Sequence, residues 1–276
     1  MRLGRKEKLK LLSLMLDRFD PASSLWRTIE ISHVIDTLSS RNICGLTLDL
    51  GCGEGNIAQI VFDKKRVEVV GLDNWKELLL QARLTKVYKY LVLGDARFLP
   101  FKKTGFKNVF SNSVIEHIEE IDSVLSEVSG VLEPKGLFIF TVPSDKFGEF
   151  LFFYRFFRGM GLRNLADWYK NKRIDLLSHF NLLDEKSWSD KLNKFGLKVV
   201  DTKVYLSKNI LSLWDVIAAF GFIFKKISCP AIIRNHLKRI EKPVFYAILS
   251  LVCAEKNLDK EMSAGLLVIA QKEAAR

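Results

Sequence analysis

Three aspartates could bind the same polar ligand, because each lies at the end of a short apolar run typical of a strand. The runs are LTLDL (46–50), VEVVGLD (67–73) and YLVLGD (90–95). A carboxylate that ends the second strand can accept hydrogen bonds from both hydroxyls of a ribose. A carboxylate after the third strand can receive the amino group of an adenine. The spacing therefore predicts a ligand that contains adenosine.

The first run leads into a glycine-rich turn, Asp49-Leu50-Gly51-Cys52-Gly53-Glu54-Gly55. Glycines at this place let the backbone turn sharply and approach a ligand closely. The spacing differs from the GxGxxG pattern of dinucleotide sites. Glu54 within the turn would also repel a pyrophosphate, which disfavours NAD. The acidic surroundings favour a cationic adenosyl ligand, S-adenosylmethionine.

The order of apolar runs predicts an α/β fold with a mostly parallel sheet, because strand patterns alternate with helical patterns. Further strands are expected at 108–114, 136–143, 197–206 and 265–272, with a turn at Glu133–Gly136. A helix is expected at 184–196, with Asp184 as its N-cap and Gly196 at its end. Two interruptions of this order, at 144–183 and 208–262, are predicted to be helical insertions.

Five segments in this order resemble the class I S-adenosylmethionine-dependent methyltransferases of the methyltransferase type 11 group. They are LDLGCGEG (48–55), VVGLDN (69–74), GDARFLPF (94–101), VFSNSVIEHIEE (109–120) and VLEPKGLFIFTVPS (131–144), and HFNLLDEKSWSDKLNKFGLKVV (179–200) extends the resemblance. The resemblance implies a Rossmann-like, seven-stranded sheet whose last strand is antiparallel. It also implies S-adenosyl-L-methionine as cofactor.

The same resemblance assigns roles to individual residues. It places Asp49, Gly51 and Gly53 at the methionine moiety, Asp73 at the ribose, and Asp95 with Ala96 at the adenine. Asn112 and Ser113 would face the methyl donor. The full set of expected cofactor-binding residues is Asp49, Gly51, Cys52, Gly53, Gly55, Asp73, Asn74, Asp95, Ala96 and Asn112.

His117 is the candidate catalytic residue, because an alcohol acceptor gains from a base whose pKa is near neutrality. The alternative is that His117 only hydrogen-bonds the backbone at the start of a helix. His179 is a second candidate for proton transfer or substrate contact. No group of histidines, cysteines and acids has the linear spacing of metal ligands, so we expect no metal site and turnover without divalent metal.

The predicted domain organisation has three parts. Residues 1–42 form N-terminal helices that cap the cofactor site. The methyltransferase core is 43–143, 184–207 and 263–276, and helical cap insertions occupy 144–183 and 208–262. Four cysteines without a CxxC pair fit a reducing cytoplasm. The N-terminus lacks the pattern of a signal peptide, because Asp17, Arg18 and Asp20 interrupt its apolar residues.

Positive charge is concentrated in the second half of the chain. Lysine and arginine exceed aspartate and glutamate by 2 in residues 1–137 and by 9 in residues 138–276. Residues 147–158, FGEFLFFYRFFR, place Phe150, Phe153, Tyr154 and Phe157 on one helical face near Arg155 and Arg158. Such a pattern is typical of a helix at an anionic membrane surface. The apolar runs 210–224 and 244–253 either contact lipid or pack as buried helices.

These observations predict O-methylation of a small molecule, a glycan or a lipid-linked acceptor, in the cytoplasm or peripherally on the inner face of the membrane. An RNA methyltransferase and a non-catalytic adenosylmethionine-binding protein remain as alternatives. Nucleic acid is the weaker partner, because Ser111-Asn112-Ser113-Val114 stands where base N-methyltransferases carry (N/D)PP(Y/F). The acceptor atom, the pathway and the oligomeric state stay open.

Overall fold

The computed structural model describes residues 3–62, 67–226 and 259–274. The predicted apolar run 244–253, Cys229 and Cys253 lie outside the described residues. The chain divides into two compact units. Unit 1 comprises residues 1–36, 146–176 and 204–264, and unit 2 comprises residues 37–145, 177–203 and 265–276.

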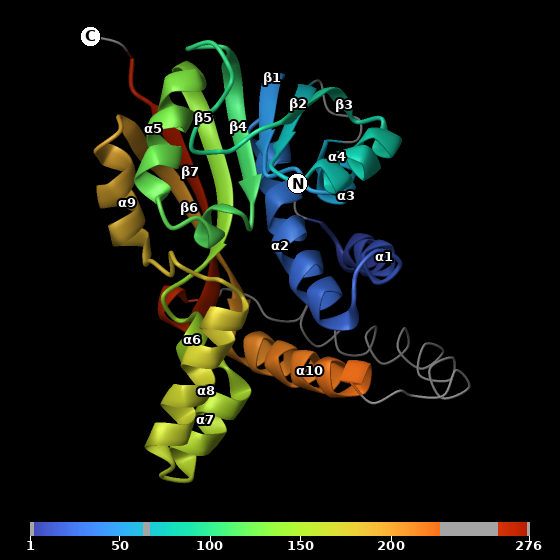
Figure 1. The fold of residues 1–276 in the computed structure, drawn as a ribbon, viewed down its shortest axis with the longest axis vertical. Coiled ribbons are helices and arrows are strands. Elements are labelled where there is room, and N and C mark those ends of the chain that lie inside the picture. Colours follow the sequence, from blue (N-terminus) through green and yellow to red (C-terminus); the bar gives the residue numbers. More distant parts are fainter. Residues whose placement is uncertain (1–2, 63–66, 227–258, 275–276) are drawn as a thin grey trace. The chain divides into compact units, whose positions relative to one another are not determined.

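The strands form one seven-stranded sheet in the order β3-β2-β1-β4-β5-β7-β6. Figure 1 shows them as arrows, and their bounds are β1 (Gly45–Leu50), β2 (Val67–Asp73), β3 (Tyr88–Leu93), β4 (Phe106–Asn112), β5 (Leu132–Pro143), β6 (Leu197–Ser207) and β7 (Ser263–Lys272). The first five strands pair in parallel, whereas β7 pairs with β5 in the antiparallel direction. This arrangement confirms the predicted fold class. The strand order reverses between β1 and β4, and open α/β sheets bind ligands at such a reversal.

The central strands form because their residues are apolar on both faces. Leu48 and Leu50 in β1, Val109 in β4 and Phe138 in β5 are all buried. Residues Ser263 to Ala270 of β7 form an unbroken buried run. A strand covered on both faces reads as a continuous apolar run rather than as an alternation. The strands could therefore be recognised in the sequence as continuous apolar runs.

Helices connect and flank the strands. Those of unit 2 are α3 (Asn56–Val61), α4 (Lys76–Ala82), η1 (Arg83–Thr85), η2 (Ile115–His117), α5 (Ile121–Val131) and α9 (Glu185–Asn193). The apolar residues of α5 recur at helical spacing and are buried, so that face packs into the core. Asp184 caps α9 as predicted, because its carboxylate accepts the amide N–H of Ser187 at 2.7 Å.

Three predicted boundaries are wrong in detail. β3 begins at Tyr88 and ends at Leu93, so Asp95 lies two residues beyond the strand instead of at its end. β4 begins at Phe106 and ends at Asn112. β5 begins at Leu132 instead of Gly136, so the predicted turn at 133–136 lies inside the strand, where the pairing with β4 jumps from Leu132 to Leu137 and Lys135 has a φ of +63°. Pairing with β4 continues on both sides of the turn, which a sequence pattern for a turn does not reveal.

Unit 1 contains α1 (Arg5–Leu16), most of α2 (Pro21–Ser40), α6 (Phe147–Phe150), α7 (Phe152–Gly159), α8 (Arg163–Leu176), α10 (Lys208–Lys226) and η3 (Lys260–Met262). Its core includes an aromatic cluster in which Trp26, Phe147 and Trp214 contact one another edge to face. Asp215 of α10 is buried, accepts the hydroxyl of Tyr169 at 2.7 Å and lies 3.2 Å from Arg173. These contacts join α8 to α10.

The face of α7 that points outward differs from the prediction. Phe150 is buried, and Phe153 and Phe157 are half-buried and pack against Tyr169 of α8. The exposed rings are instead those of Phe152 and Phe156. Helical spacing groups the residues of one face correctly, but it does not say which face packs inward.

Candidate functional site

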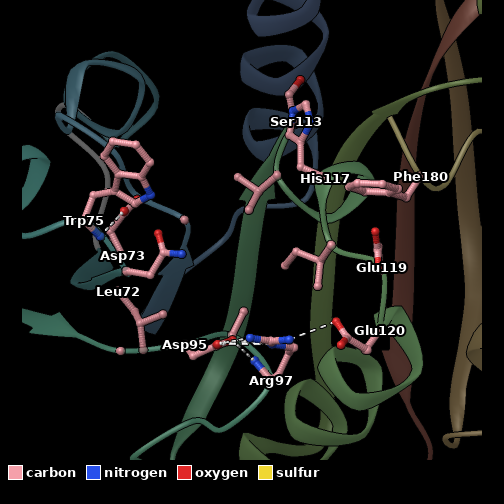
Figure 2. A pocket seen from close by; sticks show the side chains of 16 residues that line it. Leu72, Asp73, Trp75, Asp95, Arg97, Ser113, His117, Glu119, Glu120 and Phe180 are labelled. Atoms are coloured by element: carbon pink, nitrogen blue, oxygen red, sulfur yellow. Dashed lines mark hydrogen bonds and ion pairs between the residues drawn. The ribbon is translucent and has the colours of Figure 1, made fainter. Parts of the chain in front are cut away.

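A cavity of about 590 Å³ opens in unit 2 at the carboxyl ends of β2, β3 and β4. Figure 2 shows its walls, which are formed by Gly51, Leu72, Asp73, Asn74, Trp75, Gly94, Asp95, Ala96, Arg97, Ser113, Val114, His117, Ile118, Glu119, Glu120 and Phe180. The walls combine four carboxylates with the aromatic rings of Trp75 and Phe180. Such a cavity suits a cationic ligand that carries a flat base, since carboxylates attract positive charge and aromatic rings stack on bases.

Asp73 fixes the geometry at the end of β2. Its Oδ2 accepts the amide N–H of Gly53 at 2.8 Å, and its Oδ1 accepts the amide N–H of Trp75 at 3.0 Å. Each carboxylate oxygen has two lone pairs, so both can still accept a further hydrogen bond from a ligand. Asp73 therefore holds the glycine-rich turn and keeps acceptor capacity toward the cavity.

Asp95 is paired with an arginine that the sequence analysis did not assign. The guanidinium of Arg97 donates to both oxygens of Asp95 at 2.7–3.1 Å, and it also lies 2.9 Å from Glu120. The hydrogen bonds from Arg97 hold the pKa of Asp95 below its ordinary value. Figure 2 shows this chain of three charged groups along one wall. Asp95 is thus held ionised and oriented, although Arg97 takes part of its acceptor capacity.

Asp49 lies behind the cavity wall instead of lining it. Its carboxylate is buried and accepts the hydroxyl of Tyr88 at 2.7 Å. Burial raises the pKa of Asp49 to about 7, while the hydrogen bond from Tyr88 lowers it and the nearby charge of Asp73 raises it. Burial also raises the pKa of the Cys52 thiol, which keeps that thiol protonated and unreactive.

The glycine-rich turn packs tightly against the segment after β4. Gly51 has a φ of +75°, and a Cβ atom at this position would stand 2.5 Å from the side chain of Val114. A larger residue would therefore push Val114 into the cavity that both residues line. This close approach explains why glycine is needed at position 51.

Half of the expected cofactor-binding residues line the cavity: Gly51, Asp73, Asn74, Asp95 and Ala96. The other half do not line it: Asp49, Cys52, Gly53, Gly55 and Asn112. The amide of Asn112 instead donates to the hydroxyl of Thr141, a contact that joins β4 to β5. Sequence reasoning missed Trp75, Arg97 and Phe180 as wall residues. Trp75 carried a signal, because it follows Asp73-Asn74 directly, and Phe180 carried a weaker one, because it follows the candidate His179 in the segment that extends the resemblance.

His117 lies in the wall of the cavity, at the end of η2. Its Nδ1 is 3.1 Å from the carbonyl oxygen of Ser178. A carbonyl can only accept, so this contact places a proton on Nδ1, and in the neutral ring Nε2 carries the lone pair. Nε2 lies 3.7 Å from Oε1 of Glu116. Nδ1 thus makes the backbone contact of the structural interpretation, and Nε2 is the nitrogen to which the catalytic interpretation applies.

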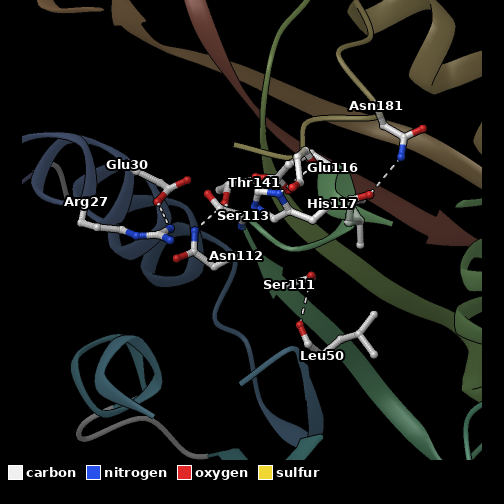
Figure 3. Close-up of polar contacts among 12 residues, drawn as sticks. Arg27, Glu30, Leu50, Ser111, Asn112, Ser113, Glu116, His117, Thr141 and Asn181 are labelled. Carbon is white, nitrogen blue, oxygen red and sulfur yellow. Dashed lines mark hydrogen bonds and ion pairs between the residues drawn. The ribbon is translucent and has the colours of Figure 1, made fainter. Parts of the chain in front are cut away.

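The structure also brings His179 to this histidine. The rings of His117 and His179 are 5.2 Å apart between centroids, and candidate ligand atoms of Glu116, His117 and His179 lie within 4.8 Å of one another. Figure 3 shows Glu116 and His117 projecting from the same short helix. We expected no metal site because no ligands are suitably spaced along the sequence. That spacing does not reveal this group, because 61 residues lie between His117 and His179.

Comparison with known proteins shows which sequences this chain resembles. Residues 48–140 match the family model described as a methyltransferase domain. Arginine-hydroxylase NDUFAF5, mitochondrial, of Homo sapiens is 33% identical over 94 residues, which make up 34% of this chain and 27% of that protein. Malonyl-[acyl-carrier protein] O-methyltransferase of Yersinia pestis is 28% identical over 131 residues, 47% of each chain. In both matches the chain spans less than half the length of the relative.

A solved structure shows the same fold over a larger part of the chain. Phosphoethanolamine N-methyltransferase 2 of Haemonchus contortus, in complex with S-adenosyl-L-methionine, superposes with a TM-score of 0.53 at 17% identity. The superposition covers 87% of this chain and 52% of that one. The matched family segment contains the turn, Asp73, Asp95 and His117. Residues 48–140 therefore match a methyltransferase domain, and the larger part of the chain has the fold of the class I S-adenosylmethionine-dependent methyltransferases.

Proposed function

We propose that this protein transfers a methyl group from S-adenosylmethionine to an oxygen atom of a small-molecule, glycan or lipid-linked acceptor. The observation that carries the proposal is the acid-lined cavity with the lone pair of His117 in its wall. The carboxylates fit the cationic donor, and the basic nitrogen fits a hydroxyl acceptor. The name of the Yersinia pestis relative, an O-methyltransferase, supports the same reaction type.

The residues of the chain have separate tasks in this reaction. When bound, the cofactor supplies a methyl group activated by a positively charged sulfur. Asp73 accepts the ribose hydroxyls and Trp75 offers a ring for stacking against the adenine. His117 accepts the proton of the acceptor hydroxyl at Nε2, while its Nδ1–H bond to Ser178 keeps the ring oriented. Positioning of the two reactants provides most of the rate enhancement.

His117→Ala is expected to lower the turnover roughly 100-fold or more, because a positioned base contributes about 10²–10⁴-fold. The dissociation constant of S-adenosylmethionine should stay within about twofold of the wild-type value, since the histidine acts on the acceptor. Both are measured with tritiated donor, using lipid, glycan and small-molecule fractions as acceptors. Equal turnover of the variant and the wild type would return His117 to a structural role.

The acceptor side is proposed to meet an anionic membrane surface. In unit 1, α7, α8 and the turn between them expose large apolar side chains: Phe152, Phe156, Met160, Leu162, Leu165, Trp168 and Leu176. Basic residues, among them Arg158, Arg163 and Lys172, are interspersed with them and exposed. Apolar contact and attraction to acidic headgroups reinforce each other on such a surface. Among the described residues, no helix is long and apolar enough to cross a membrane.

A second cavity in unit 1 supports an apolar acceptor. It has a volume of about 610 Å³ and lies between α8 and α10. Its lining includes Trp168, Leu176 and Ala219, with the charged side chains of Lys172, Arg173 and Asp175 among them. The apolar wall suits an acyl or isoprenoid chain, and the exposed Lys172 suits an anionic head, whereas Arg173 is paired with Asp215.

Co-sedimentation with vesicles tests the membrane proposal. Phe152→Ser/Phe156→Ser should weaken binding to phosphatidylglycerol vesicles by at least tenfold, because burial of one aromatic side chain contributes about 1.5–3 kcal/mol. Leu84→Ser/Phe98→Ser removes two apolar side chains of unit 2 that are more exposed than Phe152 and Phe156, and serves as the control. Binding should require acidic lipid and weaken with salt. Wild-type protein that stays in the supernatant at low salt would favour a soluble acceptor.

RNA is the competing acceptor, because the second half of the chain is basic and RNA is an anionic partner. A gel shift with RNA, titrated with salt, separates the two proposals, since each phosphate contact adds to the salt dependence. RNA binding that survives physiological salt, together with no vesicle binding, would favour the RNA methyltransferase. Binding of S-adenosylmethionine without turnover on any acceptor class would favour the non-catalytic alternative.

A further inference from the structure

We propose that Glu116, His117 and His179 form a binding site for a divalent transition-metal ion, with Zn²⁺ as the best match. One carboxylate and two imidazoles offer ligand atoms that all lie within 4.8 Å of one another. Oε1 of Glu116 and Nε2 of His117 are 3.7 Å apart. Ligand atoms about 2.0–2.1 Å from a tetrahedral Zn²⁺ stand about 3.4 Å from one another. Small side-chain rotations therefore suffice to close the site.

The donor set selects the metal. Imidazole nitrogens suit Zn²⁺ and its neighbours among the transition metals, whereas Mg²⁺ and Ca²⁺ prefer oxygen ligands alone. Three protein ligands with one position left open is the pattern of catalytic zinc sites. Here the open position would face the cavity, because His117 is partly exposed and lines it.

The backbone holds the two parts of the site together. The amide N–H groups of Phe180 and Asn181 both donate to the carbonyl oxygen of Glu116, at 2.8 Å and 3.2 Å. The side-chain amide of Asn181 donates to the carbonyl oxygens of Ile115 and Ile118 on either side of the pair. Figure 3 shows Asn181 directed toward η2. These four hydrogen bonds fasten the segment that carries His179 to the helix that carries the other two ligands.

The hydrogen bond of the Nδ1 atom of His117 is also typical of a metal-binding histidine. Its Nδ1 donates to the carbonyl oxygen of Ser178, so Nε2 carries the lone pair that a metal requires. Metal-binding histidines characteristically make such a bond to a backbone carbonyl with the nitrogen that does not bind the metal. The Glu116 side chain is only 2% exposed, and its carboxylate would interact strongly with a divalent cation in that environment.

The role of this site in catalysis rests on the proposed function. A metal at this position would bind the acceptor oxygen and lower the pKa of its hydroxyl, in place of His117 as the base. The proton would pass to water. The oxygen lone pair would then form the bond to the methyl carbon as the carbon–sulfur bond breaks, with its electron pair left on sulfur. Turnover would then need the metal, contrary to the expectation from linear spacing.

Titration of metal-stripped, full-length protein with Zn²⁺ and with Co²⁺ tests the site. Wild-type protein should bind one Zn²⁺ in competition with a chromophoric chelator, and Co²⁺ should give visible bands without the near-ultraviolet absorption of thiolate ligands. Glu116→Gln and His179→Ala should each weaken binding of Zn²⁺ by more than about 100-fold. Glu77→Gln and His33→Ala are the matched controls, since both side chains lie outside the site, and they should bind Zn²⁺ as the wild type does.

Calorimetry with S-adenosylmethionine on the same samples separates this proposal from the proposed function. Binding of the cofactor by Glu116→Gln and His179→Ala would show that both variants are folded. No Zn²⁺ binding by the wild type, or equal binding by wild type and both variants, would overturn the metal site and leave the methyltransferase intact. Turnover unchanged by EDTA in protein shown to be metal-free would overturn the catalytic role and return proton transfer to His117.

Discussion

Asp73→Ala is expected to weaken the binding of S-adenosylmethionine by roughly 2–4 kcal/mol, about 30- to 1000-fold in the dissociation constant. The substitution removes the acceptor for the ribose hydroxyls. It also removes the two hydrogen bonds by which Asp73 holds the amides of Gly53 and Trp75. Both losses weaken the binding of S-adenosylmethionine, because the glycine-rich turn and Trp75 form part of the proposed binding surface.

Calorimetric titration of folded protein measures this effect, with two variants as controls. Asp73→Asn keeps one acceptor oxygen and should lose less affinity than Asp73→Ala. Glu77→Ala removes an exposed acid on α4, a short distance along the chain, and should bind the cofactor normally. Unchanged affinity in a folded Asp73→Ala protein would defeat the assignment of the ribose site.

The second large effect concerns the dependence of stability on pH. Burial raises the pKa of Asp49 to about 7 in the folded protein, whereas its ordinary value is 3.8. The folded state therefore binds a proton that the unfolded state releases above pH 4. The stabilisation from this proton is complete below about pH 4 and is lost progressively as the pH rises to 7. A difference of about three pKa units corresponds to roughly 4 kcal/mol in the free energy of unfolding.

Asp49→Asn should remove this pH dependence, because an amide does not titrate and its oxygen can still accept the Tyr88 hydroxyl. At pH 8 the variant should be the more stable protein, by up to about 4 kcal/mol, and at pH 4 the two should be nearly equal. Urea denaturation at both pH values measures the difference. The same change of stability with pH in both proteins would show that Asp49 titrates normally.

The sheet could be predicted from the sequence because its strands are buried on both faces. β2 has the bounds that were predicted, although Glu68 interrupts its apolar run. β7 begins at Ser263, two residues before the predicted start, because the buried run extends that far. β3 is more exposed, so its pattern is weaker and the prediction placed it two residues late. Pro134 and Gly136 indicated the turn at 133–136, but the pairing of Leu132 with β4 before that turn could not be predicted, because it depends on a contact with a distant strand.

The candidate site was harder to predict from the sequence than the sheet, because its chemistry depends on contacts between segments that are distant in the sequence. The acids at successive strand ends indicated the cavity, but the pairing of Arg97 with Asp95 and Glu120 depends on side-chain geometry. His117 and His179 were each recognised as candidates, yet only the folded chain brings their rings together. The outward face of α7 likewise depends on α8, which packs against Phe153 and Phe157.

Calorimetric titration of the wild-type chain with S-adenosylmethionine tests most directly whether the acid-lined cavity binds a cationic adenosyl cofactor. We expect one molecule bound per chain, with no comparable binding of NAD, whose pyrophosphate would meet the carboxylates of the cavity. The product S-adenosylhomocysteine should compete for the same site. Binding of NAD in preference to S-adenosylmethionine, or no binding of either by folded protein, would contradict the account.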